Sequence, residues 1–252
     1  MEQQDYLDEE LRRRRARAIE KRRLRRRKRM QQLWIRRGII VFSFVLAICG
    51  IVKLAQYIGS RGMREAMSES LPQKMVLDPP DYQVDLLSIN AYSRPGLAIE
   101  EVNGIVVHYT ANPGTTAQQN RNYFEGLKDS HDTYASSHFV IGLDGEIVQC
   151  IPCNEISYAS NERNSDTISI ECCIPDETGA FNQSTYDTLV HLTAWLLGRY
   201  DLTTEDVIRH YDITGKICPK YYVEHEDAWN RFKEDVNQYI NENGVLEESL
   251  AK

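Results

Sequence analysis

Two short apolar runs, each ending at a histidine, place the strongest constraint on how this chain folds. One run, 104–107, leads into His108, and the other, 207–209, leads into His210. Each run has the composition of a strand and is followed by a loop that contains Gly or Pro. Cys218 lies in the second of these loops. Because strand ends that meet over a sheet hold side chains rigidly, the pattern predicts that two imidazoles and one thiol come together.

These three side chains suit a zinc ion. Three ligands of the His and Cys type leave the fourth tetrahedral position of zinc free for water, and an open position is typical of a catalytic site. The spacing His-x7-Cys alone is weak evidence, since many chains contain it by chance. A Zn²⁺ site formed by His108, His210 and Cys218 is supported by their placement. Each histidine ends an apolar run that has the composition of a strand, and Cys218 lies in the second of the loops that follow.

Strand and helix signals alternate after residue 100, which predicts an α/β domain with a mixed central β-sheet flanked by helices. Thr116-x-x-Gln119 is a capping-box pattern and predicts a helix start. We expect Ala117, Tyr123, Phe124 and Leu127 to face inward from that helix. Two apolar runs around Asp144-Gly145 predict a hairpin with a tight type I′ turn. Further signals predict a strand at 167–174, a helix from Ser184 to Tyr200, and a last helix at 226–240.

The N-terminal region differs sharply in charge from the rest of the chain. Residues 1–37 carry 15 Lys/Arg and 6 Asp/Glu, whereas the remaining residues carry 15 and 31. An apolar run then begins at Gly38, and residues 38–58 would form about 31 Å of helix at about 1.5 Å per residue. That length spans a bilayer, and dense Lys/Arg before it predicts a cytoplasmic N-terminus and an extracellular body. The basic arm therefore favours contact with anionic lipid over nucleic acid, and we expect no nucleic-acid partner.

A cleaved signal peptide is the alternative interpretation of the apolar run. However, 37 residues are long for its charged region, and no A-x-A-like cleavage site follows. A lipoprotein signal ending at Cys49 is matched only loosely, because bulky Ile48 stands where a small residue is needed. The expected organisation is a basic cytoplasmic arm (1–37), a single-pass transmembrane helix (38–58), a stalk (59–84), a catalytic domain (85–242) and a frayed tail (243–252). We expect the chain to be a monomer.

The segment from Asn103 to Gly114, taken with His210 to Pro219, resembles the zinc-dependent N-acetylmuramoyl-L-alanine amidases. That family includes phage lysozymes of the amidase type and is related to the peptidoglycan recognition proteins. The resemblance covers roughly residues 85–223. It implies hydrolysis of the amide between N-acetylmuramic acid and L-alanine, with peptidoglycan as the substrate.

Two other functions remain open. One is a module that binds muropeptides without cleaving them, but relatives of that kind typically lack the cysteine ligand that Cys218 supplies here. The other is a cytoplasmic amidase that recycles anhydro-muropeptides. The basic arm and the apolar run oppose that interpretation.

The resemblance also implies catalytic residues. Glu171 lies in an apolar strand, where an unpaired carboxylate is costly to bury, and many amidases of the family place a general base at this position. Lys216 matches the catalytic lysine of the family and could stabilise an oxyanion. The alternatives are a surface-facing glutamate and an ordinary loop lysine. Ser137 stands where the phage enzymes carry a tyrosine, so Glu171 has to take the base role.

Three further residues are candidate substrate contacts. His138 could touch the substrate, although we favour a structural histidine. Asn112 follows the first ligand and could shape the floor of the groove. Arg94 could bind a peptide carboxylate bidentately, or be an ordinary surface arginine.

The remaining extracellular cysteines allow three states: buried free thiols, a disulfide, or a second zinc site. The four residues are Cys150, Cys153, Cys172 and Cys173. Neighbouring residues of a strand point to opposite faces, so Cys172 and Cys173 cannot easily serve one metal centre. We expect buried free thiols.

Overall fold

The computed structural model describes residues 74–246 of the chain. These residues belong to the second of two compact units, Met1–Leu71 and Pro72–Lys252. The predicted basic arm, the membrane anchor and residues 59–73 of the stalk lie outside the described residues. Between residues 74 and 246, no helix is long and apolar enough to cross a membrane.

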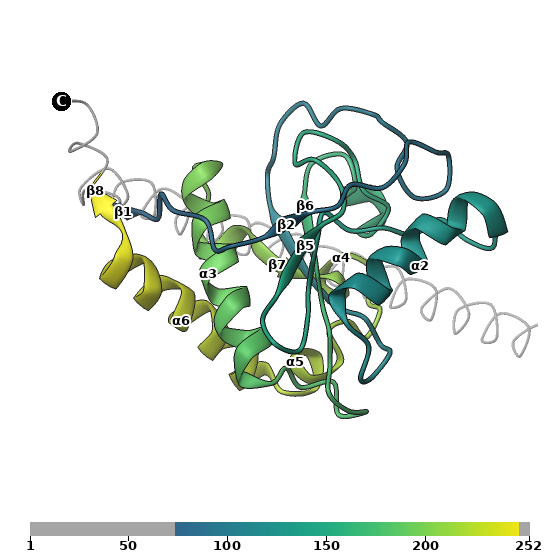
Figure 1. Ribbon diagram of the computed structural model, residues 1–252. Coiled ribbons are helices and arrows are strands. Elements are labelled where there is room, and N and C mark those ends of the chain that lie inside the picture. The colour runs from purple at the N-terminus through teal and green to yellow at the C-terminus, as the bar shows by residue number, and fades with distance from the viewer. Residues whose placement is uncertain (1–73, 247–252) are drawn as a thin grey trace, which may run out of the picture. The chain divides into compact units, whose positions relative to one another are not determined.

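A six-stranded mixed sheet forms the centre of the domain, with strand order β2-β5-β4-β6-β3-β7 (Figure 1). Neighbouring strands run parallel except for the antiparallel pair β4–β5. The strands are β2 (Gln83–Val84), β3 (Ile105–Tyr109), β4 (Phe139–Ile141), β5 (Ile147–Gln149), β6 (Ile168–Cys172) and β7 (Val207–Arg209). The predicted mixed α/β architecture is thus confirmed.

Helices cover both faces of this sheet (Figure 1). Helices α3 (Gln183–Arg199) and α6 (Glu226–Asn243) pack on one face, and α2 (Ala117–Ser130) packs on the other. Along β3 and β6, every second side chain enters the α3/α6 core; these are Ile105, Val107, Ile168, Ile170 and Cys172. Because side chains alternate along a strand, His108 and Glu171 point to the opposite face, on the side of α2.

Helix α2 begins where the capping box predicts. The side chain of Thr116 accepts a hydrogen bond from the backbone N–H of Gln119, and the side chain of Gln119 accepts one from the backbone N–H of Thr116. Phe124 is buried, whereas Tyr123 is 54% exposed, so the expectation that Tyr123 faces inward is wrong. Adjacent residues of a helix point about 100° apart, and Phe124 occupies the inward direction.

The later helices agree with expectation except for one boundary. Helix α3 starts after Asn182, whose side chain accepts from the N–H of Thr185, rather than at Ser184. Helix α6 runs to Asn243 and is followed by Gly244. Four short helical segments complete the described part of the domain: η1 (Asn161–Arg163), η2 (Thr204–Asp206), α4 (His210–Thr214) and α5 (Lys220–Glu224).

The β4–β5 hairpin is confirmed, but its turn differs from the expected type. A type I′ turn needs positive φ at both central residues. Only Gly145 has positive φ (83°), and Asp144 does not. The N–H of Gly142 instead donates to the carbonyl of Glu146 at 2.8 Å, and that of Gly145 donates to Gly142 at 3.2 Å. The connection is therefore a longer loop that closes through one left-handed glycine.

The folded domain is longer at both ends than residues 85–242. Strand β1 (Lys74–Met75) pairs antiparallel with β8 (Val245–Leu246), so the first residues of the expected frayed tail are paired. Val76 is buried in the core, and β2 adds a parallel edge strand to β5. Residues 74–84 are thus part of the domain rather than stalk, because they cover one edge of the sheet and one side of α3.

Candidate metal centre and active site

Two neighbouring parallel strands bring the histidines together. His108 is the fourth residue of β3, and His210 follows directly after β7, as the first residue of α4 (His210–Thr214). Their ring centroids lie 4.9 Å apart. Sγ of Cys218 lies 3.7 Å from Nδ1 of His108. The three potential ligand atoms all lie within 4.8 Å of one another, and all three residues are buried.

A buried arginine fixes the start of the loop that carries two of these residues. Arg209 forms ion pairs with Asp212 at 2.8 Å and with Glu226 at 2.6 Å. Its backbone N–H also donates to the carboxylate of Asp212 at 2.8 Å. At the other end of the loop, the N–H of Tyr211 donates to the carbonyl of Cys218 at 3.0 Å. These contacts hold His210 and Cys218 in one rigid turn.

Two residues outside the predicted set orient the imidazoles. Nε2 of His108 lies 3.3 Å from Oγ of Ser160, and Nε2 of His210 lies 2.9 Å from Oδ1 of Asn161. An amide oxygen only accepts, so Nε2 of His210 carries the proton and Nδ1 keeps its lone pair. That Nδ1 is buried and has no partner among the described residues. Second contacts of this kind are what orient metal-binding histidines.

The electrostatic surroundings favour metal-binding forms of the histidines. Burial lowers the pKa of His108 well below its usual value, with His210 and Lys216 lowering it further. Burial and Lys216 also lower the pKa of His210. Both rings are therefore neutral at pH 7, as metal ligation requires.

The thiol completes a donor set that fits zinc. Burial, with a smaller effect of Glu171, raises the pKa of Cys218 to about 12. A buried thiol surrounded by two neutral imidazoles becomes a ligand once a cation is present, because a coordinating thiol is deprotonated outright. The orphaned Nδ1 of His210 and the composition His-His-Cys thus both fit a tetrahedral zinc site.

Glu171 lies directly beside this centre. It is the Cα partner of His108 on the neighbouring strand β6. Its side chain is half-buried, and Oε2 is buried with no hydrogen-bond partner between residues 74 and 246. Burial raises the pKa of Glu171 to about 8, against a lowering effect of Lys216. A carboxyl group with a pKa near neutrality can both accept and donate a proton at pH 7.

One cavity of about 440 Å³ joins the two histidines to both proposed catalytic side chains. Glu171 and the exposed Lys216 line it together with His108 and His210. Tyr134 and Tyr158 also line this cavity. Tyr134 is 62% exposed and stacks on Tyr92 with 5.0 Å between ring centroids. No sequence motif predicts a role for these aromatic residues.

None of the three candidate substrate contacts lies in the wall of this cavity. His138 is fully buried; its Nε2 lies 2.8 Å from the carbonyl of Glu155, and its Nδ1 lies 3.0 Å from Oγ of Ser169. Arg94 is paired bidentately with Glu155 at 2.7 Å, so its carboxylate partner belongs to the chain itself. Asn112 is exposed. The structure therefore places His138 and Arg94 in the framework that supports the loops.

Within the described residues, the four cysteines outside the centre are free thiols: Cys150, Cys153, Cys172 and Cys173. Cys172 packs in the α3/α6 core and Cys173 in the α2 core, which confirms that they point to opposite faces. Within residues 74–246, His108, His210 and Cys218 form the one group with the composition and spacing of a metal site.

Comparison with known proteins agrees with this geometry. Residues 99–221 match the family model described as N-acetylmuramoyl-L-alanine amidase. The N-acetylmuramoyl-L-alanine amidase CwlL of Bacillus licheniformis is 34% identical over 169 residues, covering 62% of this chain and 46% of the relative. The amidase BlyA of Bacillus subtilis (strain 168) is 30% identical over 187 residues, covering 66% and 49%. The chain thus spans about half the length of these relatives.

Solved structures show the same fold. The catalytic domain of XlyA is 27% identical, with a TM-score of 0.52, and the match covers 62% of this chain and 99% of that domain. A mutant endolysin from Bacillus subtilis is likewise 27% identical, with a TM-score of 0.51, and the match covers 62% of this chain and 99% of the endolysin.

Proposed function

We propose that this chain hydrolyses the amide between N-acetylmuramic acid and L-alanine in peptidoglycan, because residues 99–221 match the family model described as N-acetylmuramoyl-L-alanine amidase. The observation that carries the proposal is one cavity lined by His108, His210, Glu171 and Lys216, with Cys218 behind the two histidines. A recognition module needs neither a buried unpaired carboxylate nor a cysteine ligand. Both features favour catalysis over binding alone.

We propose His108, His210 and Cys218 as the zinc ligands. Zinc, when bound at such a site, lowers the pKa of water and polarises a carbonyl group. Ser160 and Asn161 contact Nε2 of the two rings, which leaves each Nδ1 for a metal, and Nδ1 of His108 lies 3.7 Å from Sγ of Cys218. The proposed ligands are therefore already in position before a metal binds. Because both histidines are neutral, neither has to release a proton when the metal binds.

Glu171 acts as the general base and acid in this proposal. Its carboxylate takes a proton from the attacking water and passes that proton to the amine that leaves. The amine needs the proton because an amide nitrogen is a poor leaving group. A pKa of about 8 places both protonation states within reach at neutral pH, which is the condition for efficient proton transfer.

Lys216 supplies positive charge on the same side of the cavity. Its ammonium group is exposed, lines the cavity and lowers the pKa of Glu171, His108 and His210. Charge that develops on the carbonyl oxygen during attack is stabilised by a fixed cation of this kind. The same charge favours an ionised Glu171 before the reaction begins.

The direct test is digestion of purified peptidoglycan by the full-length, zinc-loaded chain, followed by mass spectrometry. We expect peptides with a new free L-alanine amine, and intact glycan strands whose lactyl groups carry new free carboxylates. The matched control is Cys218→Ser, which replaces a thiolate with a neutral hydroxyl. Binding of peptidoglycan without any cleavage would favour the recognition module, and cuts within the glycan or the peptide would exclude the amidase reaction.

For the whole chain, we propose a membrane-anchored monomer with a cytoplasmic N-terminus and an extracellular amidase domain. The apolar run at 38–58 and the charge difference across it support this arrangement. The proposal gives the domain access to peptidoglycan, which lies outside the membrane.

A further inference from the structure

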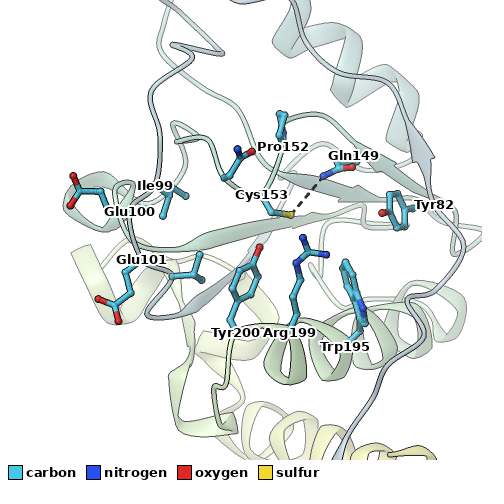
Figure 2. A pocket seen from close by; sticks show the side chains of 12 residues that line it. Tyr82, Ile99, Glu100, Glu101, Gln149, Pro152, Cys153, Trp195, Arg199 and Tyr200 are labelled. Atoms are coloured by element: carbon cyan, nitrogen blue, oxygen red, sulfur yellow. Dashed lines mark hydrogen bonds between the residues drawn. The ribbon is translucent and has the colours of Figure 1, made fainter. Parts of the chain in front are cut away.

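A second cavity, of about 650 Å³, lies away from the metal centre (Figure 2). It shares no lining residue with the zinc cavity. Its walls come from the last turn of α3, from residues 99–102 before β3, and from residues 149–154 after β5. His108 lies near the C-terminal end of β3, so the two cavities lie toward opposite ends of that strand. A volume of this size suits a small ligand.

Arg199 is the cation of this second cavity. Its guanidinium carbon lies 5.3 Å from the ring centroid of Trp195 and 5.6 Å from that of Tyr200. The aromatic contacts occupy the faces of the guanidinium, and one of its N–H groups interacts with the phenol oxygen of Tyr200. No carboxylate among residues 74–246 forms an ion pair with Arg199. The remaining N–H groups of Arg199 are therefore available to a carboxylate from another molecule.

The walls around Arg199 combine apolar surface with amide groups (Figure 2). Tyr82 and Ile99 supply apolar surface on two sides. Gln149 donates its amide N–H to the carbonyl of Ile151 at 3.3 Å and to Sγ of Cys153 at 3.7 Å, so its orientation is fixed. Its amide oxygen accepts no hydrogen bond from the described residues and can receive one from a ligand. Apolar walls with a few oriented polar groups are typical of small-molecule sites.

Charge selects among possible anions. Glu100 and Glu101 are exposed at one end of the cavity, and their carboxylates point outward in Figure 2. With Arg199, the lining carries one positive and two negative charges, which disfavours phosphates and other polyanions. A ligand with one carboxylate and one ammonium group matches this charge balance, because its anion meets Arg199 and the negative charge at the rim attracts its cation without a direct contact.

We propose that this cavity binds a short peptide with a free amino terminus and a free carboxylate. This proposal rests on the proposed function in one respect, the origin of the peptide. Hydrolysis at the lactyl–alanine bond would release a peptide with a new amine. The binding itself depends on Arg199 and its surroundings, not on zinc. The second cavity is thus a site for the released peptide or a peptide like it.

The test is calorimetric titration of the full-length chain with trialanine. The chain carries Glu171→Gln in all arms, so that turnover plays no part. We expect binding of trialanine, weaker binding of its C-terminal amide and of its N-acetyl form, and little binding of inorganic phosphate. Arg199→Ala should weaken trialanine binding about 10- to 100-fold, the range for losing a hydrogen-bonded charged pair. The matched control is Arg231→Ala, because Arg231 is exposed on α6 with 69% of its side chain accessible.

A second measurement locates the bound peptide. Cys153 is a half-buried free thiol in the cavity wall. Trialanine should slow alkylation of Cys153, measured by peptide mass spectrometry, and should do so in Cys218→Ser as well. If Arg199→Ala alters the fold, Arg199→Lys keeps the charge but loses the planar fork, and should still weaken binding.

Several outcomes would overturn the inference. They are no binding of trialanine, equal binding by the Arg199→Ala chain, phosphate binding as tight as trialanine, or loss of binding in Cys218→Ser. Failure of the amidase reaction leaves these binding results unaffected. The two proposals can therefore fail separately.

Discussion

The side-chain oxygen of Asn161 lies 2.9 Å from Nε2 of His210 and so determines which nitrogen of that ring is left for the metal. Nδ1 of His210 is buried without a partner, within reach of His108 and Cys218. Asn161 itself has a φ of 53°, a left-handed conformation that asparagine adopts more readily than most residues. The loop before β6 thus contributes to the metal centre although it supplies no ligand.

Removing this contact should weaken zinc binding. In Asn161→Ala, the ring of His210 loses its acceptor, and we expect zinc affinity to fall about 10- to 100-fold, as for other residues that orient metal ligands. The measurement is competition with a chromophoric chelator. Asn161→Asp keeps both an oxygen acceptor and tolerance of positive φ, so it serves as the matched control. Equal affinity in the alanine variant and the parent chain would assign the orientation of His210 to other contacts.

Glu171→Gln should separate chemistry from metal binding. The amide is nearly isosteric with the carboxyl group but cannot transfer a proton, so we expect the rate of peptidoglycan hydrolysis to fall about 10²- to 10⁴-fold. Zinc content and melting temperature should stay near those of the parent chain, because Glu171 is not in the proposed ligand set. Near-native turnover in this variant would place the general base elsewhere.

Lys216→Ala should lower the rate of hydrolysis, because the negative charge that develops on the carbonyl oxygen in the transition state loses a stabilising cation. We expect a loss of about 10²- to 10³-fold in kcat, the range for removing one donor to an oxyanion. Lys220→Ala is the comparison, since Lys220 lies nearby in the sequence but donates to the carbonyl of Glu177 at 2.8 Å. A loss of the same size in both variants would indicate a general effect of charge rather than a contact with the reacting group.

The sequence predicted that the two histidines lie together because each stands at the end of a short apolar strand, and it placed Cys218 in the loop that follows the second strand. Strand position fixes where a side chain lies, and β3 and β7 pair in parallel, so His108 and His210 had to come close. The roles of Ser160 and Asn161 had no such signal. They lie in a loop between strands, and their contacts depend on how that loop crosses the sheet. A loop path is set by tertiary packing, which local spacing does not encode.

The same reasoning explains the differences at the ends of the domain. Asp78-Pro79-Pro80-Asp81 breaks helices, and the sequence around it carries no strand period, which favoured a stalk. Residues 83–84 nevertheless pair with β5, because an edge strand needs only backbone groups to join a sheet. Val76 then adds a buried contact. Two-residue strands of this kind are too short for hydrophobic periodicity to reveal them.

His138 should make the stability of the domain fall in mild acid. Burial lowers its pKa to about 4 in the folded chain, against about 6.5 when unfolded. The unfolded chain therefore binds the proton first, and this contribution to stability is lost as pH falls from about 6.5 toward 4. The loss at pH 5 should be about 2 kcal/mol, from 1.36 kcal/mol per pKa unit. Urea unfolding of the parent chain and of His138→Gln at pH 7 and pH 5 measures it.

The quantity to compare is the loss of unfolding free energy between pH 7 and pH 5, in the parent chain and in His138→Gln. Glu171 has a raised pKa, so its own contribution to stability changes in the opposite direction between about pH 4.5 and 8. This contribution is common to both chains and cancels. His138→Gln should be less stable at pH 7 but should show a smaller loss on acidification. Parallel losses in both chains would contradict a neutral, buried His138.

The position of the amidase domain relative to the membrane decides whether it meets peptidoglycan. Residues 1–37 are strongly basic, residues 38–58 are apolar, and the described domain begins at Lys74. The 15 residues from 59 to 73 extend at most about 50 Å at about 3.3–3.6 Å per residue, so an anchored domain would act close to the membrane.

The experiment is protease treatment of intact cells stripped of their wall. We expect digestion of the amidase domain, while an epitope placed before Arg12 survives. Survival of the domain until the membrane is opened would place it in the cytoplasm and favour the recycling of anhydro-muropeptides.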